Sequence, residues 1–468
     1  MSPSVNPSRR RPPRGSGKTE RFTPMVEQTV AADAVVAPLH AREDSAERMP
    51  TGAILVLGFG MLGLSLVWQI YNACIPIFLQ AGRPDFPSSV VNVKGFALDP
   101  TRTGFIMTLD NIAALFLLPY IGVLSDRTQT RLGRRRPYIL VGMPLAVMAF
   151  LSIPAALSVS LGALMVALIA FLLAMDIFRT PLAAMMPDLT PSCHRSVASG
   201  IMVVLSSVGT ITAYGLGGML LKQSADRPFL LGGIGLLVTV LAVLLFVREP
   251  SLPEGEANHA AQEAPSLLPL LRSLATEAEP SARLLLLAVF TWTMASSTVE
   301  IFMSSFIIQR FAIDAGSATM MMAFFGMAAF AGAFPAGMIG KRFGRRRAIQ
   351  TGLILIACLL GSTLFVPSVA MMRLALAGMG LTWSLVMVNG LPMVLDLSRS
   401  RDTGGTYSGL FLLAGQGAAI AGPLSAGVVL DLAHRDYRAL FLYIPALMLT
   451  ALFLMRDVRR GEAHTTAA

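Results

Sequence analysis

The sequence has few charged residues for its length. Asp, Glu, Lys and Arg make up 14% of the 468 residues, whereas hydrophobic residues make up 54% and the mean hydropathy is +0.65. Soluble globular chains carry roughly a quarter charged residues, so this composition excludes an ordinary soluble domain. We therefore expect a membrane protein.

Cysteine and histidine are also scarce. The three cysteines, Cys74, Cys193 and Cys358, lie far apart, which excludes a disulfide framework and a paired-cysteine metal site. We expect three inert thiols. All five histidines fall outside the long apolar runs, so imidazole is excluded as the group that exchanges protons inside a membrane. No metal and no cofactor are expected.

Motifs of enzyme chemistry are missing as well. The sequence has no nucleophile paired with a base, no cluster of metal ligands and no glycine-rich phosphate loop. An enzyme is therefore the least favoured class of function. The formal net charge is +10, but the basic residues fall between apolar runs, which argues against nucleic acid as a partner.

What the sequence does contain is a series of twelve long apolar runs. A helix needs about 20 mostly apolar residues to cross a hydrocarbon core of ~30 Å, and the alternation typical of a membrane barrel is missing. We therefore predict an all-α membrane protein with twelve transmembrane helices. The predicted spans are 52–79, 103–124, 137–158, 160–186, 196–221, 228–247, 284–309, 317–340, 346–366, 369–396, 405–430 and 437–455.

The runs divide into two sets of six, which predicts two pseudo-symmetric six-helix bundles. Arg and Lys collect in the loops after the second and eighth spans, so the positive-inside rule predicts that both termini are cytoplasmic. No apolar run precedes residue 52, so we expect no signal peptide. The predicted segments are a disordered basic tail (1–50), a bundle (51–247), a linker (248–282), a second bundle (283–456) and a tail (457–468).

A charged turn occurs once in each half. "GVLSDRTQTRLGRRR" begins at Gly122 and "GMIGKRFGRRR" begins at Gly337, each at the end of the second span of its half. This repeat indicates a duplicated six-span unit. Carriers of that kind bind their cargo between the halves and alternate access to it.

The two stretches resemble the G-x-x-x-D-R-x-G-R-R loop of the major facilitator superfamily. The longer form "SDRTQTRLGRRRP" is similar to that of the glycoside-pentoside-hexuronide cation symporters, and more closely to that of the sucrose and maltose transporters. The stretches "WQIYNACIPIFL", "LDNIAALFLLPYIG", "MDIFRTPLAAMMPDLTP" and "VNGLPMVLDL" support the resemblance, which covers residues 50–460. It implies the major facilitator fold and a proton-coupled symporter that imports a disaccharide or glycoside by alternating access.

The resemblance also implies that the charged turn acts as a gate. Gly122 would let two helices approach closely, and Asp126 would accept hydrogen bonds from an arginine or a helix N-terminus. Such a latch would favour the outward-facing state, and simple anchoring of the arginines at the inner leaflet is the alternative. The candidate gating residues are Gly122, Asp126, Arg127, Gly133, Arg134 and Arg135.

Ionisable residues inside the predicted spans are few, and each costs on the order of 2.5–3.5 kcal/mol to insert at the bilayer centre. Asp176 and Arg179 share one helix face and can pair, so protonation of the acid would release the arginine. A fixed ion pair or a hydrogen bond between helices is the alternative. Because histidine is excluded, carboxylates are expected to carry the proton. The candidate coupling residues are Asp110, Asp176, Arg179 and Glu300.

The resemblance further bears on the coupling ion. Sodium-coupled melibiose-type relatives carry two acids in span 2, and the matching positions here are Ala114 and Leu118, which implies protons rather than sodium. Asp176 matches the acid that those relatives carry in span 4. Plant sucrose carriers have an arginine nearer the end of span 4, where this chain has Ala183, so that role does not transfer directly to Arg179.

Side chains suited to a sugar lie in the predicted spans 1, 7, 10 and 11. A sugar binds through hydrogen bonds from its hydroxyls and through its apolar faces on aromatic rings. Packing is the alternative for each candidate. Asp188 and Asp396 end spans 4 and 10, where we expect helix capping or gating between the halves. The candidate substrate-binding residues are Trp68, Gln69, Asn72, Trp292, Trp383, Asn389 and Gln416.

The sequence therefore favours a secondary active transporter of the inner cell membrane, acting as a monomer on a sugar and protons within the lipid bilayer. One alternative keeps the fold but moves an amphipathic lipid or drug, since the chain has 25 phenylalanines and 27 methionines. A second alternative is a non-transporting membrane scaffold or sensor.

Overall fold

The computed structural model describes residues 49–84, 86, 95–191, 194–249, 280–397 and 404–458. The predicted N-terminal tail up to residue 48, most of the central linker, the C-terminal tail from residue 459 and Cys193 lie outside the described residues. The regular secondary structure within the described ranges is helical throughout.

Six spans form the first half of the described chain. The fifth span consists of three consecutive segments, because a π-helical turn interrupts its α-helix. The elements are α2 (Thr51–Gln80), α3 (Pro100–Arg127), α4 (Arg136–Val159), α5 (Leu161–Leu189), α6 (Arg195–Thr212), the π-turn η2 (Ala213–Gly217), α7 (Gly218–Leu221) and α8 (Asp226–Phe246).

Six further spans form the second half. They are α11 (Pro280–Phe311), α12 (Ala315–Phe343), α13 (Arg345–Ser362), α14 (Val369–Leu395), α15 (Gly404–Leu432) and α16 (Leu440–Arg456), with short 3₁₀ turns after α13 (Thr363–Phe365) and before α16 (Tyr437–Ala439). Twelve helices of the described chain are long and apolar enough to cross a membrane. The prediction of an all-α protein with twelve spans is confirmed.

Polar caps mark where several spans begin. The Asp99 side chain accepts a hydrogen bond of 2.7 Å from the backbone nitrogen of Arg102 at the start of α3. Asp314 accepts a bond of 2.8 Å from the backbone nitrogen of Ser317 in the first turn of α12. Such side chains satisfy amide groups that have no partner within the helix.

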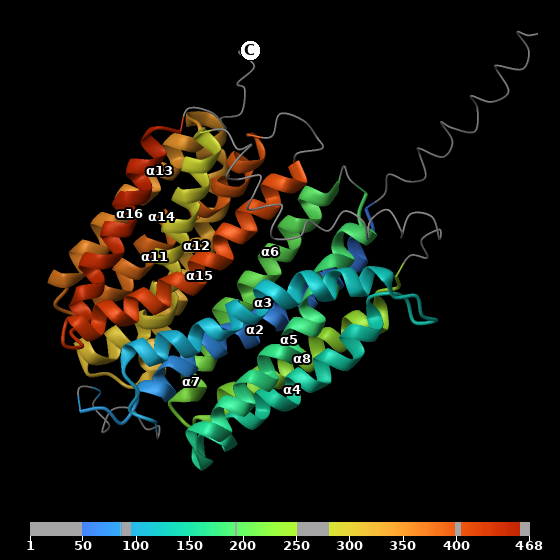
Figure 1. The fold of residues 1–468 in the computed structure, drawn as a ribbon, viewed down its shortest axis with the longest axis horizontal. Helices are drawn as coiled ribbons and strands as arrows, with labels where there is room; N and C mark the ends of the chain where they lie inside the picture. Colours follow the sequence, from blue (N-terminus) through green and yellow to red (C-terminus); the bar gives the residue numbers. More distant parts are fainter. Residues whose placement is uncertain are drawn as a thin grey trace, which may run out of the picture. The chain divides into compact units, whose positions relative to one another are not determined.

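Each half packs as a bundle of its own helices (Figure 1). In the first half α2 packs against α6 and α8, and α4 packs against α5. In the second half α14 packs against α12 and α13, and α11 packs against α15 and α16. The glycines and alanines of these spans allow the backbones to approach, which is the usual way helices associate in lipid.

The two halves meet along α3 and α15, which lie side by side (Figure 1). The helices touch closely where α3 begins and α15 ends. A Cβ atom built on Gly427 would lie 2.6 Å from the Pro100 carbonyl oxygen, and one built on Gly104 would overlap the Pro423 carbonyl oxygen. Asp431 Oδ2 accepts hydrogen bonds from the backbone nitrogen of Thr101 at 3.0 Å and from its hydroxyl at 2.5 Å.

Two more contacts join the halves at the same end. The fifth span meets α12, where a Cβ atom built on Gly218 would lie 2.8 Å from the Gly316 carbonyl oxygen. Gln80, at the end of α2, donates a hydrogen bond of 3.2 Å to the Ser305 hydroxyl of α11. We name these contacts, together with those of Gly104, Gly427 and the Thr101–Asp431 pair, the closed seam. It lies at the opposite end of the spans from the charged turns.

Candidate functional site

Ionisable and amide side chains from both halves lie near the middle of the spans. We name this group the midspan cluster. Its members are Gln69 and Asn72 of α2, Asp110 of α3, Asp176 and Arg179 of α5, Tyr214 of η2, and Glu300 of α11.

Asp176 and Arg179 form an ion pair within α5. Arg179 Nε lies 3.1 Å from Asp176 Oδ1, and the two side chains are 21% and 4% exposed. The guanidinium carbon also lies 5.2 Å from the centre of the Trp68 ring, which gives a cation–π contact. The second carboxyl oxygen of Asp176 is buried without a hydrogen-bond partner. Arg179 is therefore held between an acid and an aromatic face.

Asp110 adds a second buried acid to the same region. The residue is buried, and its Oδ1 accepts a hydrogen bond of 2.9 Å from the Asn111 amide. It lies within electrostatic range of Asp176, Arg179 and Glu300. Asp110 and Asp176 thus both interact with the same guanidinium, so gain or loss of a proton changes which pairs the arginine makes.

Glu300 connects the two halves at this depth. Its Oε1 accepts a hydrogen bond of 2.9 Å from the Asn72 amide of the first half. Gln69, one turn earlier on α2, lies close enough to the Glu300 carboxyl to interact with it. The Tyr214 hydroxyl donates a bond of 2.7 Å to Gln69 Oε1. The acid of the second half is therefore held by the Asn72 amide of the first, with the Gln69 amide beside it.

Aromatic rings border the cluster on the α2 side. Trp68 is half-buried, and its ring stacks on that of Tyr71 with centroids 5.8 Å apart. Tyr71 in turn lies 5.6 Å from Phe171, also measured between ring centroids. A half-buried indole beside polar groups offers a flat apolar surface of the kind on which a sugar ring can lie.

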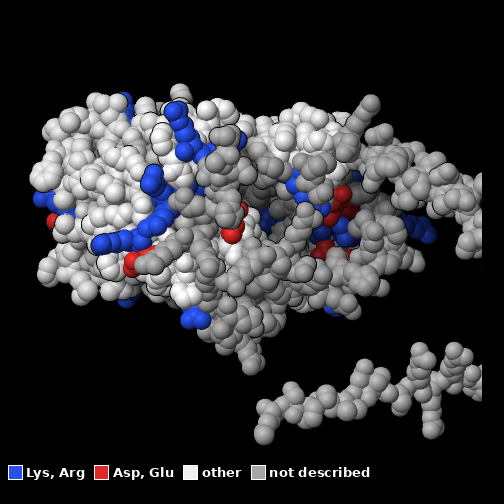
Figure 2. Space-filling model, turned by 90° about the horizontal axis from the view of Figure 1, so that it is seen from above, with Lys and Arg blue, Asp and Glu red and all other residues white. Residues whose placement is uncertain are grey.

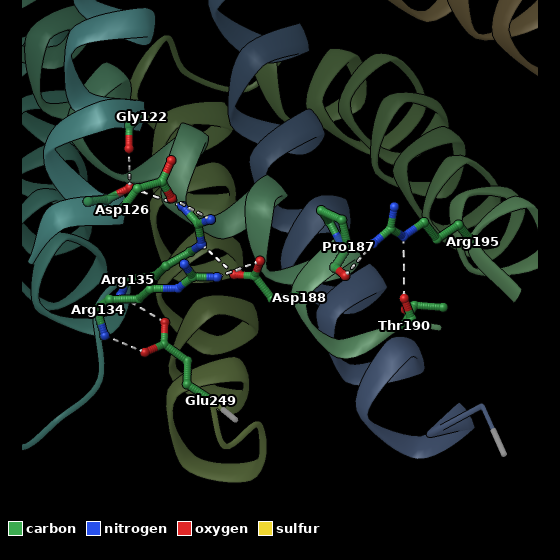
Figure 3. A network of polar contacts seen from close by, with 10 residues as sticks. Gly122, Asp126, Arg134, Arg135, Pro187, Asp188, Thr190, Arg195 and Glu249 are labelled. Atoms are coloured by element: carbon green, nitrogen blue, oxygen red, sulfur yellow. Dashed lines mark hydrogen bonds and ion pairs between the residues drawn. The ribbon is translucent and has the colours of Figure 1, made fainter. Parts of the chain in front are cut away.

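The charged turn after α3 forms ion pairs with residues at the ends of α3 and α5, as Figure 3 shows. Arg135 Nε lies 2.6 Å from Asp188 Oδ2 at the end of α5, and Arg134 Nη2 lies 2.7 Å from Asp188 Oδ1. Arg135 Nη2 also forms an ion pair with Asp126 Oδ1 at 2.8 Å, though without hydrogen-bond geometry. The turn therefore connects α3 to α5 within the first half.

Glu249, just after α8, completes this network. Its two carboxyl oxygens accept bonds of 2.6 Å and 2.8 Å from the backbone nitrogens of Arg134 and Arg135. The chain reaches this position through Gly133, whose φ of +107° suits glycine alone. Glu249 was not predicted from the sequence. The sequence shows only that an acidic residue follows the sixth span, on the side of the membrane to which the arginine-rich turns were assigned.

Similar charged side chains occupy the corresponding face of the second half. Arg345 pairs with Asp396, and Gly344 has a φ of +92°, matching Gly133. Figure 2 shows that charged side chains gather in separate groups on the end of the molecule that it views.

A sequence profile described as the Major Facilitator Superfamily matches residues 51–312 and 285–468. The chain belongs to this superfamily. It is similar to "Solute carrier family 45 member 4" of Mus musculus, with 27% identity over 191 residues that cover 38% of this chain and 22% of that protein. It is also similar to the "Membrane-associated transporter protein" of Homo sapiens, with 25% identity over 253 residues covering 48% of this chain and 45% of that protein. The chain thus matches less than half the length of these relatives.

Solved structures of other transporters have a similar fold. The nucleoside transporter NupG has a TM-score of 0.66 at 14% identity, with 87% of this chain and 100% of that chain covered. A bacterial homologue of the lysosomal transporter Spinster, inward-facing and unoccupied, has a TM-score of 0.63 at 15% identity, with 88% and 94% covered. At such identities the likeness concerns the fold alone. The chain is therefore a multi-pass membrane protein of this superfamily.

The structure brings together all four residues that the sequence suggested for proton coupling. Asp110, Asp176, Arg179 and Glu300 belong to the midspan cluster. The candidate substrate residues of α2 lie there as well. They are Trp68, whose ring lies against the Arg179 guanidinium, Asn72, which donates to Glu300, and Gln69, which lies beside Glu300.

Two candidate substrate residues of the second half, Trp292 and Asn389, pack between helices of that half. Trp292 is 1% exposed, and its ring packs beside Gly390 of α14. Asn389 is buried, and its amide donates to the Ala336 and Leu385 carbonyl oxygens at 3.2 Å and 2.9 Å. Both side chains are used for packing between helices of the second half, which was the alternative for each. Trp383 and Gln416 are half-buried on α14 and α15.

The expected close helix approach at Gly122 is not present. A Cβ atom there would meet only the Thr180 methyl at 3.7 Å, an ordinary contact, whereas one on Gly133 would overlap the Glu249 carboxyl. Asp126 was expected to accept a hydrogen bond, but its Oδ1 forms only an ion pair with Arg135 and has no hydrogen-bond partner. Arg127 is exposed.

Asp188 and Asp396 were expected to cap helices or to gate between the halves. Asp396 is the C-cap residue of α14, as expected. Neither side chain joins the halves, because Asp396 pairs with Arg345 and Asp188 pairs with Arg134 and Arg135, all within the same half. The physical reason is that the halves meet at the closed seam, at the opposite end of the spans.

Proposed function

We propose that this transporter is a proton-coupled symporter that imports a disaccharide or glycoside of the sucrose or maltose type. It works as a monomer in the inner cell membrane, with both termini in the cytoplasm. The observation that carries the proposal is the midspan cluster. In it Asp176 pairs with Arg179 in one half, Glu300 of the other half accepts a hydrogen bond from Asn72, and Asp110 interacts with both acids and with the arginine.

Proton uptake would change the pairing inside the cluster. Ionised Asp176 holds Arg179, and a proton on the acid removes the charge that attracts the guanidinium. The released arginine then donates to a cargo hydroxyl or to Asp110. The protonation state of Asp176 thereby selects between two arrangements of the Arg179 side chain, and coupled transport requires such a link between proton binding and conformation.

The same charge state bears on the contact between the halves. Ionised Glu300 is a strong acceptor for the Asn72 amide, and hydrogen bonds to charged groups are roughly twice as strong as neutral ones. Protonation of Glu300 weakens this bond. Proton binding at midspan thus favours movement of one half against the other around the cargo.

A sugar suits the surroundings of Trp68. Its half-buried ring provides an apolar face, while Arg179 and the α2 amides supply donors within the same region. The resemblance of the charged turn and of four span segments to the sucrose and maltose branch supports this cargo class.

The arginine-rich turns support the orientation. Basic residues favour the cytoplasmic ends of spans, which puts the Gly133 and Gly344 turns inside. On this assignment the closed seam faces outward. A seam closed on the outer side is expected in the inward-facing state, in which the cargo leaves toward the cytoplasm.

Uptake of radiolabelled sucrose and maltose by a transport-deficient strain tests the proposal. Cells with the native protein should accumulate one of the sugars, more at acidic than at neutral external pH. Asp176→Asn should abolish accumulation against the gradient. Asp226→Asn, an exposed acid at the start of α8, is the matched control and should accumulate sugar normally.

Two results would reject parts of the proposal. No uptake of either sugar by cells whose membranes contain the native protein would reject the cargo class. Undiminished uphill accumulation by the Asp176→Asn protein would reject the role of this acid in coupling.

A further inference from the structure

The fifth span contains a π-helical turn that no proline imposes. The turn η2 (Ala213–Gly217) lies between α6 and α7, and residues 195–221 include no proline. A π-turn inserts an extra residue into the helical repeat, and such turns are frequent at functional sites. Here it contacts α2 on one side and α12 on the other.

The π-turn presents Tyr214 to the midspan cluster. The side chain is 5% exposed, and its hydroxyl donates a bond of 2.7 Å to Gln69 Oε1. Gln69 in turn lies beside Glu300, which accepts a hydrogen bond of 2.9 Å from Asn72. Polar side chains therefore follow one another from η2 through α2 to α11.

The chemistry of the amide fixes the orientation of the Gln69 side chain. A carboxylate can only accept, so Gln69 must turn its NH₂ group toward ionised Glu300. The amide oxygen then faces the other way, where the Tyr214 hydroxyl donates to it. A phenol at this position therefore selects the amide orientation that turns the Gln69 N–H donors toward Glu300.

We propose that Tyr214 is a positioning residue that acts through Gln69 to hold Glu300 in its ionised form. The inference rests on the proposed function, because it requires Glu300 to exchange a proton. Without the hydroxyl, the Gln69 amide can rotate and turn its oxygen toward the acid. An oxygen in that place accepts from a protonated carboxyl and so favours the neutral form.

The same turn leads directly into the closed seam. Gly218 follows η2, and a Cβ atom on it would lie 2.8 Å from the Gly316 carbonyl oxygen of α12. Rearrangement of η2 would therefore move both the Tyr214 hydroxyl and this contact between the halves. Opening of the seam and protonation of Glu300 are linked through one short segment.

Other titratable groups around Glu300 are limited in number. Asp110 and Tyr214 lie within electrostatic range of it, and Asp110 also interacts with Tyr71 and the α5 pair. In the described part of the chain, the remaining helices and turns packed on α11 carry their charged and phenolic groups close to their ends. These are Lys341 and Arg342 of α12, Arg373 of α14, Tyr407 and Asp431 of α15, Tyr437 and Arg438 of the 3₁₀ turn, and Tyr443 and Arg456 of α16.

Infrared difference spectroscopy on the full-length protein in liposomes tests the inference without any sugar. The carbonyl stretch of a protonated carboxyl is followed as a function of pH, and the Glu300 band is identified by its loss in Glu300→Gln. In Tyr214→Phe this band should persist to a pH higher by about half a unit or more, as loss of one donor to a charged acceptor implies.

Two further variants make the test specific. Tyr443→Phe removes a tyrosine–serine hydrogen bond of 2.6 Å between α16 and α15, outside the cluster, and should leave the Glu300 titration unchanged. Gln69→Leu should shift the titration in the same direction as Tyr214→Phe. The double variant should shift it no further than Gln69→Leu alone, since the hydroxyl acts through the amide.

Several results would overturn the inference. The first is a Glu300 titration that is unchanged in Tyr214→Phe, or one that shifts equally in Tyr443→Phe. The second is a double variant in which the shifts of the two single variants add. The third is a native protein without a Glu300 band that responds to pH. A shift of the expected kind in a protein without sugar-dependent proton flux would reject the proposed function alone. Normal flux with an unchanged titration in Tyr214→Phe would reject the inference alone.

Discussion

Arg179 makes two contacts that only a planar guanidinium can combine. It pairs with the Asp176 carboxyl at 3.1 Å and lies over the Trp68 ring at 5.2 Å. A lysine ammonium is a compact point charge without a flat face, so it cannot reproduce both contacts. The residue therefore contributes its shape as well as its charge.

Arg179→Lys should reduce sugar uptake about tenfold or more, because a desolvated cation–π contact contributes about 2 kcal/mol. Arg373→Lys is the matched control. This arginine lies over the Phe324 ring at 5.8 Å on α14, outside the cluster. Initial uptake rates at equal protein levels in the membrane provide the measurement. Equal losses in the two variants would show that the Trp68 contact has no special role.

The sequence revealed the charged members of the cluster and their neighbours on α2, but it could not separate those neighbours from candidates that pack elsewhere. Asp110, Asp176 and Glu300 could be predicted because a carboxyl stands out in an apolar span. Trp68 and Trp292 could not be told apart, since their spans are apolar on all sides and show no preferred face. Only tertiary packing makes one ring half-buried beside Arg179 and the other 1% exposed.

The charged turn between α3 and α4 depends on one backbone position. Gly133 has a φ of +107°, and the space beside its Cα is filled by the Glu249 carboxyl that binds the next two backbone nitrogens. The second half has Gly344 at φ +92° and the Arg345–Asp396 pair, so the repeated "GRRR" reflects a repeated structure. The first half adds Asp126 and Glu249 to the arginines.

Gly133→Ala should destabilise the turn, since an alanine at positive φ costs about 1 kcal/mol or more and here also displaces Glu249. We expect slower transport and a lower melting temperature in detergent. Gly122→Ala should change neither, because its Cβ would make only an ordinary contact with Thr180. Thermal unfolding and uptake rates of both variants provide the test. If Gly122→Ala slowed transport and lowered the melting temperature while Gly133→Ala did not, Gly122 would be the site of close helix approach.

The sequence could predict this turn as a motif but not its partners. Glu249 lies more than a hundred residues from the turn that it binds, and no local pattern marks such a pairing. The π-turn was likewise not predicted, because "TAYGLGG" has the composition of an ordinary small-residue helix contact.

The twelve spans and their division into halves could be predicted for the whole chain, since length and hydropathy alone identify membrane helices. The end of the spans at which the two halves meet could not be predicted from the sequence. It depends on contacts such as Gly427 against Pro100 and Asp431 against Thr101, which join residues more than three hundred positions apart. Those contacts also define the conformation described here, with the closed seam opposite the charged turns.

Gly427→Leu should prevent the seam from closing, because even a Cβ atom there would lie 2.6 Å from the Pro100 carbonyl oxygen. Gly415→Leu on the same helix is the control, since a Cβ atom at Gly415 has no neighbour within 4 Å. Spin labels at the exposed positions Arg102 and Leu432, in a background without Cys193 and Cys358, report the separation across the seam. We expect longer distances in Gly427→Leu only. Identical distance distributions in the two variants would contradict the assignment of the seam.

The central claim is that the carboxyls of the midspan cluster exchange protons as the cargo moves. Proteoliposomes with a pH-sensitive dye inside, supplied with sucrose or maltose outside, test it most directly. The account predicts internal acidification with the native protein and with Asp226→Asn, but none with Asp176→Asn or Glu300→Gln. Sugar entry without proton movement, or normal acidification in the Asp176→Asn and Glu300→Gln proteins, would contradict it.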